Sequence, residues 1–253
     1  MNETIKIQLN HRTIREFKNQ PLPKEDLEKL HDVINMTASS NGMQNYSVIR
    51  VTDQNIKNEL AEIGLQEYMR RAPELLIFIV DLYRNYKIAQ EMGKENKIMI
   101  GFDKFMQGFT DACLAAQNYV VAAESLGYGT NYYGNIHNDT KKVIDLLKLP
   151  KYTFPVVGVG IGIPNQKPQL KPRMPFELKM FDNGYKKFDS YLEAIKDYDQ
   201  VMQTYYDLRD ANKRVDSFSK QIVKKQASLI ANREDVYKAF LDQGFVINKN
   251  WFI

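Results

Sequence analysis

Hydrophobic positions recur at helical spacing in two long segments of the chain. In residues 21–37, Leu27, Leu30 and Ile34 fall on one face, which predicts an amphipathic helix. A longer helical pattern covers residues 105–129 and carries alanines on one face. Because small side chains let another helix approach closely, this segment is predicted to be a central helix or a helix at a dimer interface.

Four shorter segments have the composition of strands. Residues 46–51 alternate and are β-branched, and residues 73–83 form a continuous apolar run that predicts a strand buried on both faces. Residues 154–164 predict an apolar, glycine-rich strand, and residues 130–135 predict a strand with its loop. A helix is expected between these two, at residues 138–150.

The pattern changes in the last third of the chain. Residues 162–185 are rich in proline, lysine and asparagine and show little periodicity, which predicts a long functional loop. A capping box that begins at Ser190 starts a further predicted helix, and residues 232–245 form the final one. We therefore expect one domain over residues 1–253, with a loop and helical excursion at about 163–230.

Composition adds that the chain is globular and only mildly basic. Of its 253 residues 43% are hydrophobic, which is ample for a large core. Lys and Arg number 35 and Asp and Glu 31, so the net charge is +4. Proteins that bind the backbone of nucleic acids usually carry a larger, clustered excess, so we expect no nucleic-acid partner. A net charge of +4 is more consistent with a local binding pocket for a small anion.

The cysteine count and the apolar runs favour the cytoplasm. The single cysteine, Cys113, allows no intramolecular disulfide, and the N-terminal residues lack the pattern of a signal peptide. The longest apolar runs are too short to span a bilayer, so no membrane partner is expected.

Several familiar motifs of catalysis are missing from the sequence. The three histidines are scattered and there is no CxxC pair, so no metal site is expected. There is no GxSxG elbow and no GxxxxGK[ST] loop. The "GVGIG" of residues 158–162 resembles part of a dinucleotide fingerprint, but Pro164 and a loop follow where a helix should begin. We interpret these glycines as strand positions that allow close approach of backbone or ligand.

Basic residues gather in three short segments: Arg12 with Arg15, Lys171 with Arg173, and Arg209 with Arg214. A solvated surface is the plain alternative for each cluster, but prolines stiffen the second one and so favour phosphate binding. Gly134, at a strand end, is either a turn residue or a place where a flat ligand lies against the backbone. Since no catalytic acid pair or nucleophile motif is in view, the chemistry is expected to belong to a bound anionic cofactor.

Five segments occur in the order and spacing of one known family: "HRTIREF" (11–17), "TASSNGMQNYSVIRV" (37–51), "DACLAAQNYVVAAESLGYGTNYYGNIHN" (111–138), "LKPRMP" (170–175) and "LRDANKR" (208–214). With them the chain resembles the FMN-dependent nitroreductase superfamily over nearly its whole length. Within it, the chain is most similar to the NADPH-linked, oxygen-insensitive nitroreductase and flavin reductase group. The resemblance implies an α+β fold, a mostly antiparallel sheet flanked by helices, and an intertwined homodimer with FMN at the interface.

The resemblance also implies roles for individual residues. The phosphate and ribityl end of FMN would be held by His11, Arg12, Thr13, Lys171 and Arg173. The pyrimidine edge of the flavin would meet Arg15 and Gln66, and its N5 and O4 side would meet the backbone at Gly134 and Asn135. Tyr132 and Tyr133 would narrow the flavin face. The partner subunit would contribute Ser39, Ser40 and Gln44, and the 2′-phosphate of NADPH would bind Arg209 and Arg214.

The reaction that the resemblance implies is a ping-pong transfer. NADPH would deliver hydride to FMN N5, NADP⁺ would leave, and a small electron acceptor such as a nitroaromatic, quinone or flavin would take its place. No side-chain base is expected in the first half. The alternative is a flavin-binding storage or sensor module on the same fold, which Arg209 and Arg214 disfavour because flavin binding alone does not need them.

The chain departs from the pattern of the family at two positions. Asn135 stands where the family commonly has a second glycine, and its bulk is expected to alter the shape of the substrate space. His137 stands where the family commonly has arginine. Arg70 and Arg71 lie close to Gln66 in sequence and leave open a preference for anionic substrates.

Overall fold

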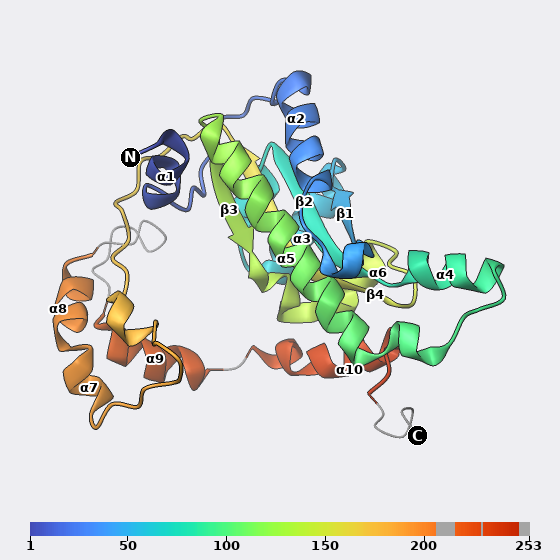
Figure 1. Cartoon of the computed structure of the whole chain (residues 1–253). Coiled ribbons are helices and arrows are strands. Elements are labelled where there is room, and N and C mark those ends of the chain that lie inside the picture. The colour runs from blue at the N-terminus through green and yellow to red at the C-terminus, as the bar shows by residue number, and fades with distance from the viewer. Residues whose placement is uncertain (206–215, 229, 248–253) are drawn as a thin grey trace. The chain divides into compact units, whose positions relative to one another are not determined.

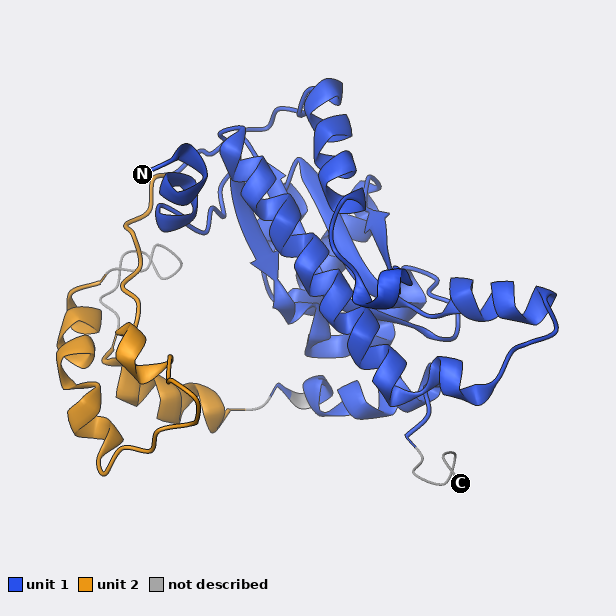
Figure 2. Ribbon diagram, viewed as in Figure 1, with its two compact units in different colours: residues 1–166, 230–253 blue, residues 167–229 orange. Residues whose placement is uncertain are grey.

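The protein is described by a computed structural model that covers residues 1–205, 216–228 and 230–247 (Figure 1). The chain divides into two compact units (Figure 2). The first comprises Met1–Gln166 with Ile230–Ile253, and the second comprises Lys167–Leu229. The single-domain organisation expected from the sequence stays a prediction.

A four-stranded antiparallel sheet of order β1-β2-β4-β3 forms the centre of the first unit. Its strands are β1 (Tyr46–Arg50), β2 (Glu74–Asp81), β3 (Gly129–Tyr133) and β4 (Thr153–Gly162). All four predicted strands are therefore present. Every residue of β2 is buried, as its continuous apolar run predicts for a strand covered on both faces.

The long predicted helix is α5 (Phe102–Ser125), which crosses one face of the sheet (Figure 1). Its alanine face, which includes Ala112, Ala116 and Ala123, is fully buried within this chain. Of the two roles predicted for that face, the structure thus shows the central one, because small side chains let the helix lie close to the strands. The helix ends before Gly127, whose φ of +84° suits glycine.

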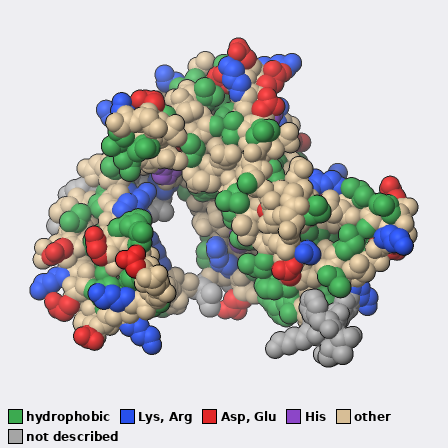
Figure 3. Space-filling model, in the orientation of Figure 1, with side chains coloured by type: hydrophobic (Ala, Val, Ile, Leu, Met, Phe, Trp, Pro, Cys, Tyr) green, Lys and Arg blue, Asp and Glu red, His purple; other side chains and the backbone are tan. Residues whose placement is uncertain are grey.

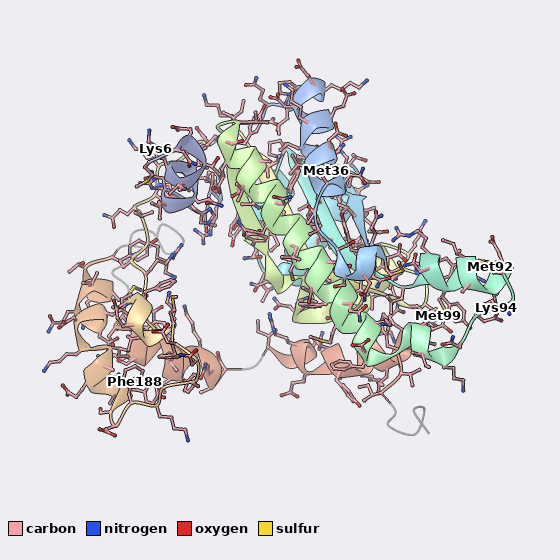
Figure 4. All side chains as sticks on the ribbon, viewed as in Figure 1. Lys6, Met36, Met92, Lys94, Met99 and Phe188 are labelled. Atoms are coloured by element: carbon pink, nitrogen blue, oxygen red, sulfur yellow. The ribbon has the colours of Figure 1, made fainter. Side chains whose placement is uncertain are left out.

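The remaining helices of the first unit surround this core: α1 (Glu3–Leu9), α2 (Lys24–Asn35), α3 (Gln54–Gly64), α4 (Tyr83–Glu91), α6 (Thr140–Leu146) and α10 (Val236–Asp242). Short 3₁₀ turns join them: η1 (Ser40–Gly42), η2 (Glu67–Arg71), η3 (Lys97–Ile100), η4 (Gly134–Asp139) and η7 (Ala231–Asp235). The predicted face of α2 is confirmed, since Leu27, Leu30 and Ile34 are buried. Met92 and Lys94 mark the end of the excursion that α4 and η3 make from the sheet (Figure 4).

The glycines of β4 make room for one aromatic ring. A methyl group on Gly160 would lie 2.7 Å from Cε2 of Tyr133, and one on Gly158 would lie 3.2 Å from its Cβ. The Tyr133 side chain is fully buried in this space. The interpretation of the glycines as positions of close approach is confirmed, and what approaches is a side chain of the neighbouring strand.

The second unit begins with a largely irregular stretch, residues 167–190, where the sequence predicts a loop, and continues with short helices. It contains η5 (Phe176–Leu178), α7 (Tyr191–Ala194), α8 (Lys196–Thr204) and α9 (Phe218–Gln226). The Ser190 hydroxyl accepts a hydrogen bond from the Glu193 backbone N–H at 3.3 Å, as the capping box predicts. The helix is interrupted at Ile195, however, where the backbone leaves helical geometry between α7 and α8. No helix in the described parts of the chain is long and apolar enough to cross a membrane.

Candidate cofactor-binding site

The segment of residues 11–18 lies along the edge of the sheet. Thr13 forms a parallel bridge with Thr130 of β3, and the Ile14 backbone N–H donates to the Thr130 carbonyl at 2.8 Å. Ile14 packs so closely that a methyl group on Gly129 would lie 2.7 Å from its Cβ. Ile14 and Phe17 are buried, and the polar residues between them stay partly exposed. The two buried residues hold the segment in place and leave its polar side chains free to face a ligand.

His11 is held by a carboxylate of α5. Its Nδ1 lies 2.6 Å from Oε1 of Glu124, and the same oxygen accepts a hydrogen bond from the Thr130 hydroxyl at 2.5 Å. The carboxylate side chain is 12% exposed and the imidazole 30% exposed. Three elements therefore meet at Glu124: the 11–18 segment, α5 and β3.

Arg12 and Arg15 have no carboxylate partner within the described residues. Arg12 donates to the Asn10 carbonyl at 3.0 Å, and the guanidinium carbon of Arg15 lies 5.9 Å from the centre of the Tyr68 ring. The Nε atoms of both arginines are buried without an acceptor. Two cations that lack counter-ions, beside partly exposed backbone, are what an anionic ligand requires.

Gln66 and Asn135 approach the Arg15 side of this segment. The Gln66 amide donates to the Tyr68 hydroxyl at 2.5 Å, and its Oε1 is buried without a partner. The Asn135 amide donates to the Gly64 carbonyl at 3.3 Å. A methyl group on Gly64 would lie 3.6 Å from Gln66 Oε1 and 3.8 Å from the Asn135 Cβ, so both side chains flank the same glycine.

The two tyrosines of β3 differ in position. Tyr132 is partly exposed and its hydroxyl donates to Gln117 at 3.0 Å. Tyr133 is fully buried beneath β4, so its side chain does not narrow an open face, and a ligand can meet it only through its backbone. The adjoining Gly134 has open space where a side chain would stand.

Residues 39–45 contact the other end of α5. The buried Asp111 carboxylate accepts hydrogen bonds from the backbone N–H groups of Ser40 at 2.8 Å and of Asn45 at 3.3 Å. Gly108 permits this contact, because a methyl group there would lie 2.5 Å from the Asn45 carbonyl oxygen. Ser39 and Ser40 are partly exposed, and Gln44 is exposed with a φ of 49°. The prediction for this loop did not anticipate that Asp111 holds it.

The loop of residues 39–45 and the segment of residues 11–18 are far apart on this helix. Asp111 and Glu124 stand thirteen residues apart, which is roughly 20 Å at 1.5 Å per residue. Within one chain the predicted site residues thus form two groups. Asp111 and Glu124 were both missed from the sequence, although each is an acidic residue within an otherwise apolar helix.

The other predicted residues belong to the second unit, Lys167–Leu229. Lys171 and Arg173 are exposed on the loop before η5, where the Tyr198 hydroxyl donates to the Pro172 carbonyl at 3.4 Å. Arg209 and Arg214 lie outside the described residues.

Two neighbouring arginines pair with acids. Arg71 bonds Glu16 at 2.7 Å and so ties η2 to the 11–18 segment, and Arg70 bonds Glu67 at 2.9 Å. No cluster of three His, Cys, Asp or Glu side chains able to hold a metal exists among the residues described.

Comparison with known proteins decides the family. The model of the nitroreductase family matches residues 9–163, and the model of that family's C-terminal domain matches residues 171–248. The chain belongs to the nitroreductase family. The family and the fold predicted from the sequence are thereby confirmed.

Its relatives within the nitroreductase family match along nearly the whole chain. An NADPH-dependent oxidoreductase of Staphylococcus saprophyticus is 34% identical over 243 residues, covering 94% of this chain and 95% of that protein. An FMN reductase (NADPH) of Bacillus subtilis is 35% identical, covering 88% and 91%. The solved structure of NfrA2 of B. megaterium has a TM-score of 0.90 at 30% identity, covering 98% of this chain and 100% of that one.

His137, one of the two positions at which a departure from the family pattern was expected, has a structural role here. Its Nε2 donates to the Val156 carbonyl at 2.9 Å, and its Nδ1 lies 3.3 Å from the Thr140 hydroxyl. Its ring stacks against Phe154. Burial lowers the pKa of His137 because the cation would lose its hydration, and the nearby charge of Arg233 lowers it further.

This lowered pKa predicts a loss of stability in mild acid. Below about pH 6.5 an unfolded histidine binds a proton that the folded His137 does not. The free energy of unfolding should therefore fall as pH decreases from 7.5 to 5.5. Replacing His137 by Gln should reduce this dependence, because the amide does not titrate. Urea unfolding of both proteins at the two pH values measures the difference, and equal losses would contradict the assignment.

Proposed function

We propose that this protein is an NADPH-dependent oxidoreductase that binds FMN and reduces small electron acceptors such as nitroaromatics, quinones or flavins. The observation that carries the proposal is the pair of cations without a carboxylate partner, Arg12 and Arg15, on the segment that Thr13 bridges to β3. The names of its relatives support it, since they are NADPH-dependent oxidoreductases and an FMN reductase. With a single cysteine and no membrane-crossing helix described, we place the protein in the cytoplasm.

The residues present fit the two ends of FMN. The phosphate carries negative charge and acceptor oxygens, which suit His11, Arg12 and Thr13. Arg15 and Gln66 supply a cation and an unpaired amide oxygen, which suit the pyrimidine edge of a flavin. We assign Lys171 and Arg173 to the phosphate end as well. When bound, FMN would supply the redox chemistry, by accepting hydride and passing electrons on.

This chain's residues would bind and orient the cofactor. A positive charge at Arg15 would stabilise negative charge that develops at the nearby ring edge on reduction. The backbone at Gly134 is open to close contact because no side chain stands there. The Asn135 side chain is turned toward the Gly64 carbonyl, to which its amide donates.

We further propose that the active form is a homodimer. The loop with Ser39, Ser40 and Gln44 contacts α5 roughly 20 Å from the point where the 11–18 segment does, which favours contact with the cofactor of a second copy. The surface of α5 supports this, since residues 105–123 contain one charged residue, the buried Asp111. In Figure 3 few charged side chains lie over this helix. The apolar side chain of Met36, the residue that follows α2, is also 81% exposed in the single chain (Figure 4).

Anaerobic reduction tests the proposed function. The purified protein should be yellow with one FMN per chain, and NADPH should bleach the flavin absorbance. Addition of a quinone or nitroaromatic should then restore it. A yellow protein that NADPH cannot bleach would favour the alternative of a flavin-binding storage or sensor module.

The 2′-phosphate assignment predicts a selective kinetic defect. Replacing both Arg209 and Arg214 by Ala should raise the KM for NADPH roughly tenfold or more, because charge-assisted hydrogen bonds to the phosphate are lost. The KM for NADH, which lacks that phosphate, should change little. Steady-state assays with both nucleotides make the comparison, and an equal rise in both KM values would refute the assignment.

The two arginines of the 11–18 segment should differ in their effect on the flavin. Arg15→Ala should lower the midpoint potential of bound FMN by an amount on the order of tens of millivolts, since a cation near the reduced ring is removed. Arg12→Ala should mainly weaken FMN binding. Spectroelectrochemical titration measures the potentials, and a larger shift in Arg12→Ala would show that the two roles are exchanged.

A further inference from the structure

Glu124 is an acidic side chain that contacts His11, one of the predicted phosphate-binding residues. It lies in the last turn of α5, which ends at Ser125. A carboxylate near the C-terminus of a helix faces the negative end of the helix dipole, so helix stability does not explain it. Its contacts do, because Oε1 accepts from both His11 and the Thr130 hydroxyl.

We infer that Glu124 is a positioning residue for the phosphate end of the cofactor and that it acts through His11. This inference rests on the proposed function, in which His11 meets the phosphate of FMN. Glu124 itself would stay behind His11, since its side chain is 12% exposed whereas the His11 side chain is 30% exposed.

Hydrogen-bond chemistry fixes the state of the ring. A carboxylate only accepts, so His11 Nδ1 must carry the hydrogen in its 2.6 Å contact with Glu124. This leaves Nε2, which makes no hydrogen bond within the described residues, to meet a ligand. A phosphate oxygen also accepts, so Nε2 would donate to it when the cofactor is bound.

The arrangement also fixes the direction of the ring. Glu124 is itself held by Thr130, a fully buried residue of β3. The Thr130 carbonyl accepts from the Ile14 backbone N–H, so the carboxylate and the segment that carries His11 share one support. The imidazole is thereby oriented before a ligand arrives, which lowers the entropy lost on binding.

Replacing Glu124 by Gln tests the inference, because the amide keeps the size of the side chain and removes its charge. Apoprotein affinity is measured for FMN and for riboflavin, which has the same ring and ribityl chain but no phosphate. We expect FMN affinity to fall about tenfold or more and riboflavin affinity to change less than about twofold. A FMN-to-riboflavin ratio equal to that of the wild type would overturn the inference.

A matched control separates this effect from a general loss of charge. Glu16→Gln removes one negative charge from the same segment, but Glu16 pairs with Arg71 and not with His11. It should leave the FMN-to-riboflavin ratio close to that of the wild type. In a His11→Ala background, Glu124→Gln should have no further effect on the ratio, because the residue through which it acts is gone. An undiminished effect there would mean that Glu124 acts by another route.

Spectroscopy gives a readout that a merely structural role would not move. With ¹⁵N-labelled histidine, FMN should shift the Nε2 signal of His11 in the wild type, because that nitrogen meets the phosphate, and riboflavin should not. The FMN-induced shift should shrink in Glu124→Gln. Parallel loss of affinity for both flavins in the variant would indicate a folding role and overturn the inference. Failure of the wild type to bind FMN at all would instead remove the proposed function itself.

Discussion

The close approach of the 11–18 segment to the sheet is the constraint on which the candidate site depends. Ile14 occupies the space that a side chain on Gly129 would fill, and Phe17 stands 2.9 Å from where a methyl group on Gly162 would lie. Any larger residue at either glycine would push the segment outward. His11, Arg12 and Arg15 owe their places to this contact, because Ile14 and Phe17 are the buried residues that hold the segment against the sheet.

The helix α5 organises the site from the opposite direction. Its alanines bring it close to the strands. Its two acidic residues Asp111 and Glu124 each bind a separate segment of the chain. A buried carboxylate that accepts backbone or side-chain donors is stable because its charge is satisfied. One helix thus sets the positions of both predicted groups of ligand-binding residues, at points roughly 20 Å apart along its axis.

Local sequence patterns predicted most of the helices and strands, but they did not show which distant residues contact one another. The periodicity of residues 21–37 and the apolar run of residues 73–83 depend on near neighbours, so both were recognisable from sequence alone. The break at Ile195 was not, because the capping box marks where a helix starts and carries no signal for an interruption. Likewise Tyr133 looked like a surface residue of a site, since nothing local shows that Gly160 opens a space for its ring.

The candidate site also has an energetic signature that sequence could not show. Arg50, Arg71 and Arg84 each pair with an acid, which is the usual state of arginines at a protein surface. Arg12 and Arg15 instead hold their Nε groups buried and unpaired, and an unsatisfied buried donor typically costs about 1–3 kcal/mol. A ligand that supplied acceptors would recover part of this cost, and its binding would stabilise the folded chain. The two arginines whose unpaired Nε groups lower the stability of the folded chain are therefore the ones that would bind an anion tightly.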